Sequence, residues 1–336
     1  MAISIKDVAR KAGVSPSTVS RALSDHPRIS RETKERIRRL ATEMGYSPSA
    51  VARSLVTKRT HIIGLAVGWV SDPFLAQLVR GAEDTAVMHG YTVFLSSFYD
   101  EPYREMEVLA AFRERRVDGV IVKSSSLVMD HELHLADFGL PLVLVNHPEH
   151  TYSVSTDNLH GGQLATEYLL EMGHSRIGYL AAERGGRTNQ HRLEGYKKTL
   201  QERGIDFNSA LVAQGDGYAA GGKEAMRKLL ALPAPPTAVF CYNDLTAMGA
   251  AKAVREAGLQ VPDDISLVGF DDIELASYFH PPLTTVRQPA YELGRRAMEM
   301  VLALMANGNQ VPNVALKGEL IVRHSCRPLK SSISDA

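Results

Sequence analysis

From Ile62 onward, short apolar segments alternate with segments that have the length and spacing of amphipathic helices. We predict buried strands at Ile62–Val67, Val93–Ser96, Gly119–Val122, Leu142–Val145, Ile177–Leu180, Ala238–Cys241 and Ser266–Gly269. The helices predicted between them are Phe74–His89, Tyr103–Arg115, Asn158–Met172, Arg192–Arg203, Gly221–Ala231 and Asn243–Ala257. This alternation predicts right-handed βαβ units, with helices on both faces of a parallel sheet. Because one ordinary sheet would not hold so many strands, we expect two doubly wound lobes that meet at a cleft.

The charge of the chain is divided between two regions. The 336 residues carry no formal net charge, but residues 1–60 hold 13 Lys and Arg against 5 Asp and Glu, a charge of +8. The remaining residues hold 25 against 33, a charge of −8. This asymmetry favours a small basic module for nucleic acid attached to an acidic globular body. A solvated charged face is the alternative.

Cysteine usage and hydropathy indicate the cellular compartment of the protein. Cys241 and Cys326 lie far apart in the sequence, so we expect no disulfide framework and a reducing cytoplasm. The N-terminal segment lacks the apolar run of a signal peptide. The longest apolar stretch, near Ile62–Val70, is about half as long as a membrane-spanning helix. We therefore expect a soluble cytoplasmic protein with no membrane partner.

The first 60 residues have the pattern of short helices and contain no predicted strand. Ser4 and Asp7 form an S-x-x-D capping box at the first helix, and Ser15-Pro16 gives the second an N-cap and an N1 proline. The predicted helices end at Ala12 and at about Leu23, and two more cover Ile29–Gly45 and Ala50–Val56. Two short helices joined by a turn that contains glycine predict a helix-turn-helix.

The second helix is predicted to present polar side chains to solvent. Val19 and Leu23 are spaced to face a small core, which leaves four side chains outside: Ser17, Thr18, Ser20 and Arg21. In a helix-turn-helix this helix enters the major groove, where Ser and Thr reach bases or phosphates and Arg can pair with guanine. We favour DNA binding over a generic three-helix bundle with a polar surface.

Several long segments resemble one known family. They are IKDVARKAGVSPSTVSRAL, GYSPSAVARSL, VFCYNDLTAMGA, VPDDISLVGFDD and PPLTTVRQP. The chain resembles the lactose-repressor/galactose-repressor (LacI/GalR) family of bacterial transcriptional regulators over essentially its whole length. The resemblance implies an α/β protein with an all-α helix-turn-helix headpiece and a two-lobed body, similar to periplasmic binding proteins, with doubly wound parallel sheets.

The resemblance also implies domain boundaries. We expect a DNA-binding headpiece at 1–46, a hinge helix and linker at 47–59, and an effector-binding and dimerisation body at 60–336. Within the body, the N-lobe would comprise about 60–160 and 290–320, and the C-lobe about 161–289 and 321–330. Ser325–Ala336 is expected to form a loose tail, and it holds no leucine-heptad segment for tetramerisation.

The resemblance assigns operator contacts to the headpiece and hinge. Ser17 and Arg21, with Pro16 beside them, occupy the positions that read bases, and Thr18 and Ser20 would mainly contact phosphates. The full predicted DNA-binding set is Ser4, Pro16, Ser17, Thr18, Ser20, Arg21, Ser30, Ala52 and Leu55. Because few of these side chains can read bases directly, DNA shape is expected to contribute to recognition.

Leu55 in the hinge is expected to act as a wedge. In the family, the hinge helices of two subunits enter the minor groove and a leucine opens a central base step. Unstacking costs a few kcal/mol and is offset by contacts that the kinked duplex permits. Ala52 is small enough to allow close approach to the groove or to the partner helix. The alternative is that Leu55 packs against the body.

One recognition helix reads only a few base pairs, so we expect a homodimer. Two headpieces would bind successive major grooves, about 34 Å apart, on a pseudo-palindromic double-stranded operator. As a bacterial regulator, the protein would be cytoplasmic and associated with the nucleoid when bound to DNA.

Polar residues follow the predicted strands of the body. Asp72-Pro73-Phe74, Asn146, Asn243-Asp244 and Asp271-Asp272 each come directly or soon after a strand, and Arg192 is expected to open a helix. In open α/β sheets, ligands lie outside the carboxyl ends of the strands. Carboxylate, amide and guanidinium groups suit neighbouring hydroxyls, and an aromatic ring can cover an apolar sugar face. Ordinary turn and cap chemistry is the alternative for each residue taken alone.

The resemblance sharpens the expected effector site. Asn146, Arg192, Asn243, Asp271 and Gln288 match effector-contacting positions, and Asp72 and Phe74 complete the predicted set. Gly217 stands where relatives often carry an aromatic residue, and Tyr218 follows one residue later. The expected effector is a sugar or glycoside, and the alternative is a nucleobase or nucleoside.

Signatures of enzymes and cofactors are not met. His131-Glu132-Leu133-His134 places its second histidine one residue too early for HExxH, and no Walker A or G-x-G-x-x-G motif follows a strand. We expect no enzyme activity, no cofactor and no metal; His147 and His150 are interpreted as a solvated turn. The competing function classes are a cytoplasmic sugar-binding or sugar-processing protein without a DNA role, and a constitutive architectural protein.

The wedge hypothesis for Leu55 leads to a prediction. Leu55→Ala should weaken binding to the specific operator much more than binding to nonspecific DNA, because only the specific complex contains the opened base step. Fluorescence anisotropy titrations with both DNAs would measure the two affinities. An equal loss of affinity for both would contradict the wedge role.

Overall fold

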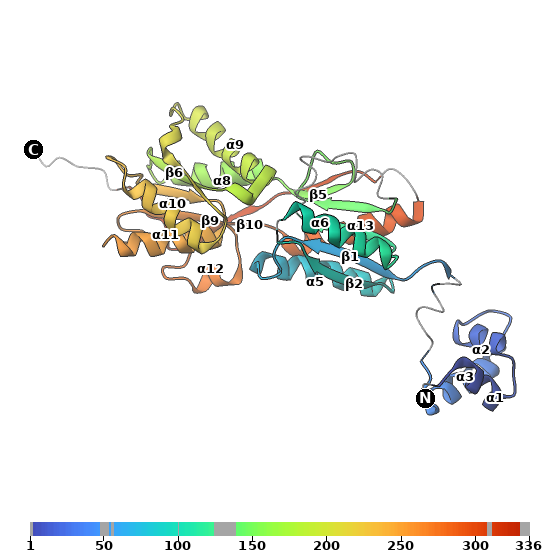
Figure 1. Cartoon of the computed structure of the whole chain (residues 1–336). Helices are drawn as coiled ribbons and strands as arrows, with labels where there is room; N and C mark the ends of the chain where they lie inside the picture. Colours follow the sequence, from blue (N-terminus) through green and yellow to red (C-terminus); the bar gives the residue numbers. More distant parts are fainter. Residues whose placement is uncertain are drawn as a thin grey trace, which may run out of the picture. The chain divides into compact units, whose positions relative to one another are not determined.

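The computed structural model describes residues 3–47, 54, 57–99, 101–123, 139–307 and 311–329. The chain divides into two compact units, Met1–His61 and Ile62–Ala336. In Figure 1 the described residues of the first unit form helices, and those of the second form two sheets with helices around them. The expected helix at 50–56, which includes Ala52 and Leu55, lies outside the described residues apart from Ser54.

The described residues of the N-terminal unit form the helices α1 (Ile5–Ala12), α2 (Pro16–Leu23) and α3 (Arg31–Glu43). Its core is small and consists of Val8, Ala9, Ala12, Val19, Ala22, Ile37 and Ala41. Gly13 has a φ of 66°, a left-handed conformation that ends α1 without the steric penalty of a side chain. The helix predicted from Ile29 begins at Arg31, because Ser30 caps it.

The part of the C-terminal unit that the structure describes forms two six-stranded sheets, so the prediction of two doubly wound lobes is confirmed. The first sheet has the order β11-β5-β4-β3-β1-β2, with strands at Val314–Leu316, Ser153–Thr156, Leu142–Val145, Gly119–Lys123, Ile62–Val67 and Thr92–Ser97. The second has the order β12-β10-β9-β8-β6-β7, with strands at Glu319–Ile321, Thr284–Arg287, Ser266–Asp271, Ala238–Cys241, Ile177–Ala182 and Val212–Gly215. Neighbouring strands are parallel except for β10 and β12.

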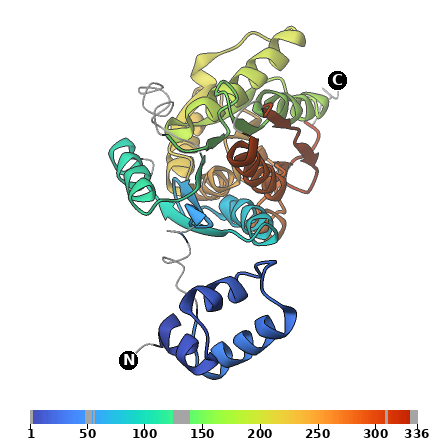
Figure 2. The same ribbon diagram turned by 90° about the vertical axis from the view of Figure 1, so that its right-hand side faces the viewer.

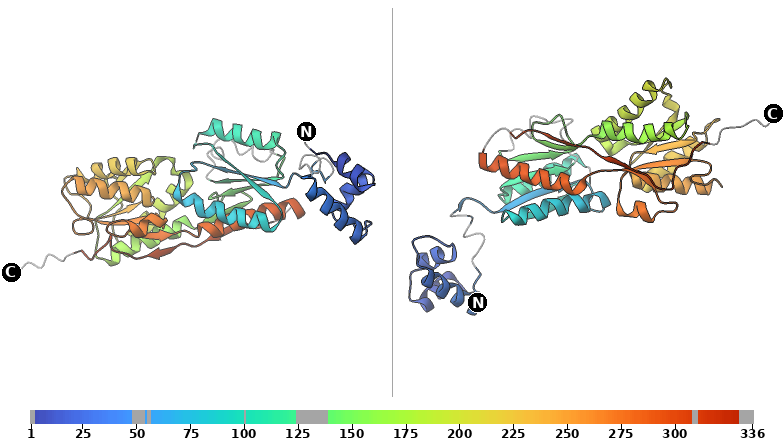
Figure 3. Two further views of the ribbon diagram at one scale, coloured as in Figure 1. Left: turned by 90° about the horizontal axis from the view of Figure 1, so that it is seen from below. Right: turned by 180° about the vertical axis from the view of Figure 1, so that it is seen from behind.

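Helices cover both faces of each sheet. On the first sheet, α5 (Pro73–Met88) and α13 (Ala290–Asn307) lie side by side on one face, and α6 (Pro102–Glu114) covers the other (Figures 2 and 3). On the second sheet, the pair α8 (Asn158–Glu171) and α9 (Gly186–Glu202) lies opposite the pair α10 (Ala219–Leu230) and α11 (Asp244–Glu256). A short helix, α12 (Glu274–Tyr278), follows β9. None of the described helices combines the length and apolar character that a membrane span requires.

The alternation of side chains along the strands explains why helices pack on both faces of each sheet. Ile63, Leu65 and Val67 of β1 belong to the cluster that contains α5 and α13 side chains, whereas Ala66 lies with the α6 side chains Leu109 and Phe112. Successive residues of a strand point to opposite faces, so a strand that is apolar throughout is buried on both.

The chain passes between the two sheets three times. It crosses after β5 into α8, after β10 into α13, and between β11 and β12. The polar residues at the carboxyl ends of the strands are therefore brought to the junction of the two lobes.

Some expectations were wrong. The helix predicted from Arg192 begins six residues earlier, at Gly186, directly after a 3-10 turn at Glu183–Gly185. The expected loose tail is bound as far as Leu329, whose N–H donates to the Met172 carbonyl at 2.8 Å. Within it, Ser325 is completely buried: its hydroxyl donates to the Leu267 carbonyl at 2.6 Å and accepts from the Thr284 N–H at 2.8 Å.

Ser325→Ala should lower the free energy of unfolding by about 1–3 kcal/mol, because it leaves a buried N–H and a buried carbonyl without this partner. Urea unfolding followed by circular dichroism would measure the change. Ser277→Ala is the matched control, since its hydroxyl is exposed and water can replace its bond. Equal stability of the two variants would contradict a structural role for Ser325.

Candidate functional site

The surface of α2 carries most of the predicted DNA-reading residues. Ser17, Ser20 and Arg21 are exposed, as is Pro16, whereas Thr18 is half-buried. Val19 is fully buried, as predicted. The Ser15 hydroxyl accepts from the Thr18 N–H at 3.1 Å, which fixes the start of the helix. The capped helix therefore presents hydroxyls and one guanidinium to solvent.

Ser4 and Ser30 have local roles at helix starts. The N–H and the hydroxyl of Ser4 donate to Asp7 Oδ2, at 3.0 and 2.6 Å, so the predicted pairing of these two residues is present. The Ser30 hydroxyl accepts from the Thr33 N–H at 3.3 Å. Both serines are exposed, so a helix cap and a phosphate contact are compatible at each position.

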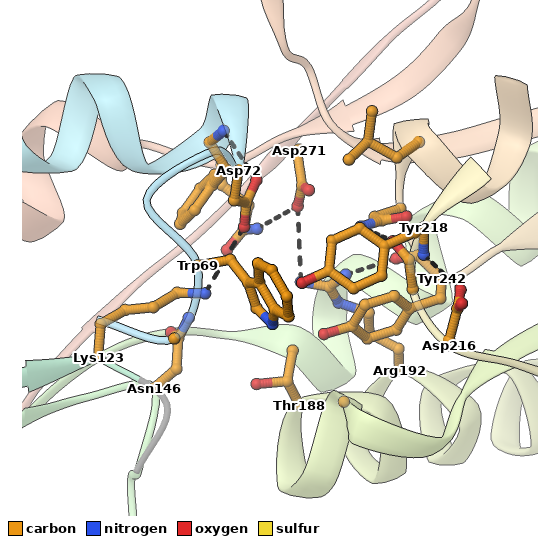
Figure 4. Close-up of a pocket in the computed structure, with 17 residues that line it drawn as sticks. Trp69, Asp72, Lys123, Asn146, Thr188, Arg192, Asp216, Tyr218, Tyr242 and Asp271 are labelled. Atoms are coloured by element: carbon orange, nitrogen blue, oxygen red, sulfur yellow. Dashed lines mark hydrogen bonds and ion pairs between the residues drawn. The ribbon is translucent and has the colours of Figure 1, made fainter. Parts of the chain in front are cut away.

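A cleft between the lobes collects all seven residues of the predicted effector set (Figure 4). About 730 Å³ of empty space lies between its walls, including space that is open to solvent. The predicted residues that line it are Asp72, Phe74, Asn146, Arg192, Asn243, Asp271 and Gln288. The other polar and aromatic residues of its wall are Trp69, Lys123, Thr188, Asp216, Tyr218 and Tyr242.

Arg192 lies at the base of this cleft and is only 2% exposed. Its Nε donates to Asn158 Oδ1 at 2.9 Å, and its Nη1 donates to the Tyr242 carbonyl. Its guanidinium carbon lies 3.6 Å from the centroid of the Phe270 ring. A buried guanidinium needs several partners, and this one is held by groups from separate elements of the C-lobe.

Asp271 faces Arg192 across 3.8 Å, and its side chain is 9% exposed. Burial raises the pKa of Asp271 to about 7, because removal from water disfavours the charged carboxylate. The positive charge of Arg192 opposes this shift. The backbone of the same residue has a φ of 113°, which is uncommon for residues other than glycine. A carboxyl group that titrates near neutrality in a cleft is a feature of functional sites.

A hydrogen-bonded chain continues from Asp271 to the N-lobe. Gln288 donates to Asp271 Oδ1 and accepts from the Thr156 hydroxyl at 2.7 Å. The N–H of Thr156 in turn donates to Asn146 Oδ1 at 3.0 Å. Asn146 also has a left-handed backbone, with a φ of 65°. Asp271 ends a strand of the second sheet and Thr156 one of the first, so this chain joins the two lobes.

Asp72 and Asn243 each cap a helix and also line the cleft, which are the two roles that the sequence left open. The Asp72 carboxylate caps α5 by accepting from the Phe74 N–H at 3.0 Å and lies 3.9 Å from Lys123 Nζ. Asn243 caps α11 by accepting from the Thr246 N–H at 2.9 Å. Both nevertheless line the cleft, so turn chemistry and a place in the site are not exclusive.

Sequence reasoning missed several residues of the cleft wall. Trp69 and Tyr242 follow β1 and β8, Asp216 follows β7, and Lys123 ends β3. Trp69, Tyr242 and Lys123 follow predicted strands, so the rule that selected Asp72 could have selected them as well. Asp216 could not have been found in this way, because β7 was not predicted. No group of three or more His, Cys, Asp or Glu side chains among the described residues has a metal-binding arrangement. The His131–His134 segment lies outside those residues.

Comparison with known proteins identifies the family. Residues 4–49 match the model for bacterial regulatory proteins of the lacI family, and residues 166–326 match a periplasmic binding protein-like domain. The HTH-type transcriptional repressor CytR of Escherichia coli (strain K12) is 38% identical over 333 residues, covering 98% of this chain and 97% of that protein.

Two solved structures extend the comparison. The lac repressor dimer bound to operator and the anti-inducer ONPF is 29% identical, with a TM-score of 0.89 over 97% of this chain and 100% of that one. The CelR–cellobiose complex is 30% identical, with a TM-score of 0.75 over 96% and 99%. This chain therefore belongs to the lacI family of DNA-binding transcriptional regulators.

Proposed function

We propose that this protein is a transcriptional repressor whose affinity for operator DNA is controlled by a sugar or glycoside bound between the lobes of its body. In this proposal residues 1–46 bind DNA, residues 47–59 form the hinge, and residues 60–336 bind effector and form a homodimer. The protein acts in the bacterial cytoplasm, at the nucleoid when it is bound to DNA, and we assign it no catalytic activity.

The main support for an interlobe effector is the hydrogen-bonded chain from Asp271 through Gln288 to Thr156, with Arg192 lying 3.8 Å from Asp271. A ligand that contacts Asp271 touches a group connected to both sheets. Its binding free energy can therefore depend on the angle between the lobes, which is the requirement for an effector that shifts a conformational equilibrium.

The polar groups of the cleft favour a sugar. A carboxylate and a guanidinium side by side can accept from and donate to neighbouring hydroxyls, and the Phe74 ring offers an apolar surface. The CelR structure contains cellobiose, and this relative covers nearly the whole chain. The second candidate is a nucleobase or nucleoside, which the three aromatic side chains Trp69, Tyr218 and Tyr242 would suit by stacking.

The headpiece supports operator binding by a dimer. Ser17, Ser20 and Arg21 are exposed on a capped helix, and the lac repressor relative is a dimer on its operator. Two copies of α2 would read half-sites about 34 Å apart. Effector binding would rotate the lobes, change the spacing of the N-lobes in the dimer and alter the order of the hinge. A coupling of about 1–3 kcal/mol, five- to 150-fold in affinity, suffices for such a switch.

Arg21→Ala should reduce specific operator affinity by about 1–3 kcal/mol and relax selectivity at the contacted base pair. Selection from random DNA would give the operator, and anisotropy titrations over a salt series would compare the variant with the wild type. A steep salt dependence is expected for both because several phosphates are neutralised. A wild type that shows no salt dependence, or that selects no operator, would refute the regulator proposal.

Effector affinity should rise with pH between about 6 and 8. A ligand hydroxyl bonds more strongly to the Asp271 carboxylate than to the carboxylic acid, so binding lowers the pKa of Asp271 from about 7 and releases a proton. Asp271→Asn should weaken binding by about tenfold or more at pH 8 and remove most of the pH dependence.

Thermal shift of the full-length protein with a sugar and nucleoside library would find the ligand by mass action, and calorimetry at each pH would give its affinity. Asp206→Asn, at an exposed position, is the control. A pH dependence that persists in Asp271→Asn would assign the titration to another group. Unchanged regulation in this variant would favour an architectural role for the protein.

A further inference from the structure

Trp69 is the single tryptophan of the chain, and it connects the two walls of the cleft. It follows β1 in the N-lobe, where its ring meets that of Tyr99 edge to face, with 5.0 Å between centroids. Its other neighbour is Tyr218 of the C-lobe, at 5.8 Å and an interplanar angle of 74°. The indole is therefore fixed from both lobes by edge contacts.

The indole N–H of Trp69 makes no hydrogen bond with any of the described residues, and its Nε1 atom is buried. The nitrogen is a donor only, so it has no alternative way to be satisfied. In Figure 4 the ring stands among the cleft residues, with its nitrogen on the edge turned toward Thr188. A buried, unpaired donor in a cleft is a position at which a ligand acceptor would be bound.

Gly217 stands in the cleft wall at the position where the sequence resemblance leads one to expect an aromatic ring. It has a φ of 88°, and a Cβ atom there would contact Ala182 and Tyr242. The aromatic side chains that line this cleft are instead Trp69, Tyr218 and Tyr242, together with Phe74. Tyr218, displaced by one residue, supports the indole from the side.

The charges of the cleft indicate which ligands fit. Lys123 Nζ lies 3.9 Å from Asp72, and Arg192 lies 3.8 Å from Asp271, so both cations that line the cleft already face a carboxylate. Asp216 adds a third carboxylate to the wall. A phosphate group would have to displace a carboxylate from its cation and would be repelled by it, whereas an uncharged ligand would not.

We propose that Trp69 determines the ligand specificity of the cleft by donating its indole N–H to an acceptor atom of an uncharged effector. The inference rests on the proposed interlobe effector, and it adds the residue that selects the ligand and the charge class of that ligand. A hydroxyl or ring oxygen of a sugar and a carbonyl or ring nitrogen of a nucleoside are the acceptors that satisfy it.

The test uses full-length protein and the fluorescence of Trp69, which reports from the cleft alone because no other tryptophan is present. The probes are glucose, ribose, cellobiose, cytidine and adenosine, each compared with its phosphate ester where one exists. Thermal shift identifies binders, and the emission of Trp69 should change on binding. Calorimetry then compares wild type with Trp69→Phe, which keeps an aromatic ring but removes the donor.

Trp69→Phe should weaken binding of the uncharged probe about three- to tenfold, as expected for the loss of one hydrogen bond. Tyr103→Phe, at a position 75% exposed and outside the cleft, should leave the affinity unchanged. Operator binding without effector checks that each variant is folded.

The outcomes separate this inference from the proposed function. Binding of an uncharged probe that is equally tight in Trp69→Phe, or that leaves Trp69 emission unchanged, overturns the role of Trp69 and leaves the effector proposal in place. Preference for a phosphate ester overturns the charge argument. Failure of every probe to bind overturns the sugar or nucleoside effector, and the inference falls with it.

Discussion

The burial of Arg192 is the constraint on which the body depends. A guanidinium removed from water needs polar partners. Asn158 and the Tyr242 carbonyl accept its hydrogen bonds, and the Asp271 carboxyl group faces it at 3.8 Å. These groups lie at the carboxyl ends of strands or at the start of a helix, so satisfying one side chain aligns the edge of the second sheet. Asp271 then passes the constraint through Gln288 to the first sheet.

The sequence predicted those parts of the protein whose physical cause is local. Continuous apolar segments located the central strands to within about two residues, and the cap pairs at Ser4 and Ser15 located the first two helices. The strand-end rule brought Asp72, Asn146 and Asp271 to one cleft, because parallel strands place their carboxyl ends together. Asn243 caps a helix and also lines the cleft, so the two interpretations of such a residue both hold.

The parts that were not predicted depend on contacts distant in sequence. Strands such as β5, with the sequence SVST, are too short and polar to be recognised before their neighbours are known. Ser325 looked like tail, but its hydroxyl completes bonds of residues 41 and 58 positions away. The place of Trp69 after a strand was visible in the sequence, but its contact with Tyr218 of the other lobe was not.

The three passages of the chain between the sheets have a consequence for synthesis. The first sheet begins with β1, but its outer strand β11 and the helix α13 that covers it leave the ribosome only after the central strands of the second sheet. The lobe whose first strand is synthesised first is thus the last to be completed. The apolar face of its sheet beside α5 stays exposed until α13 has been synthesised. Until then, the nascent chain exposes apolar surface through which unfinished chains can aggregate.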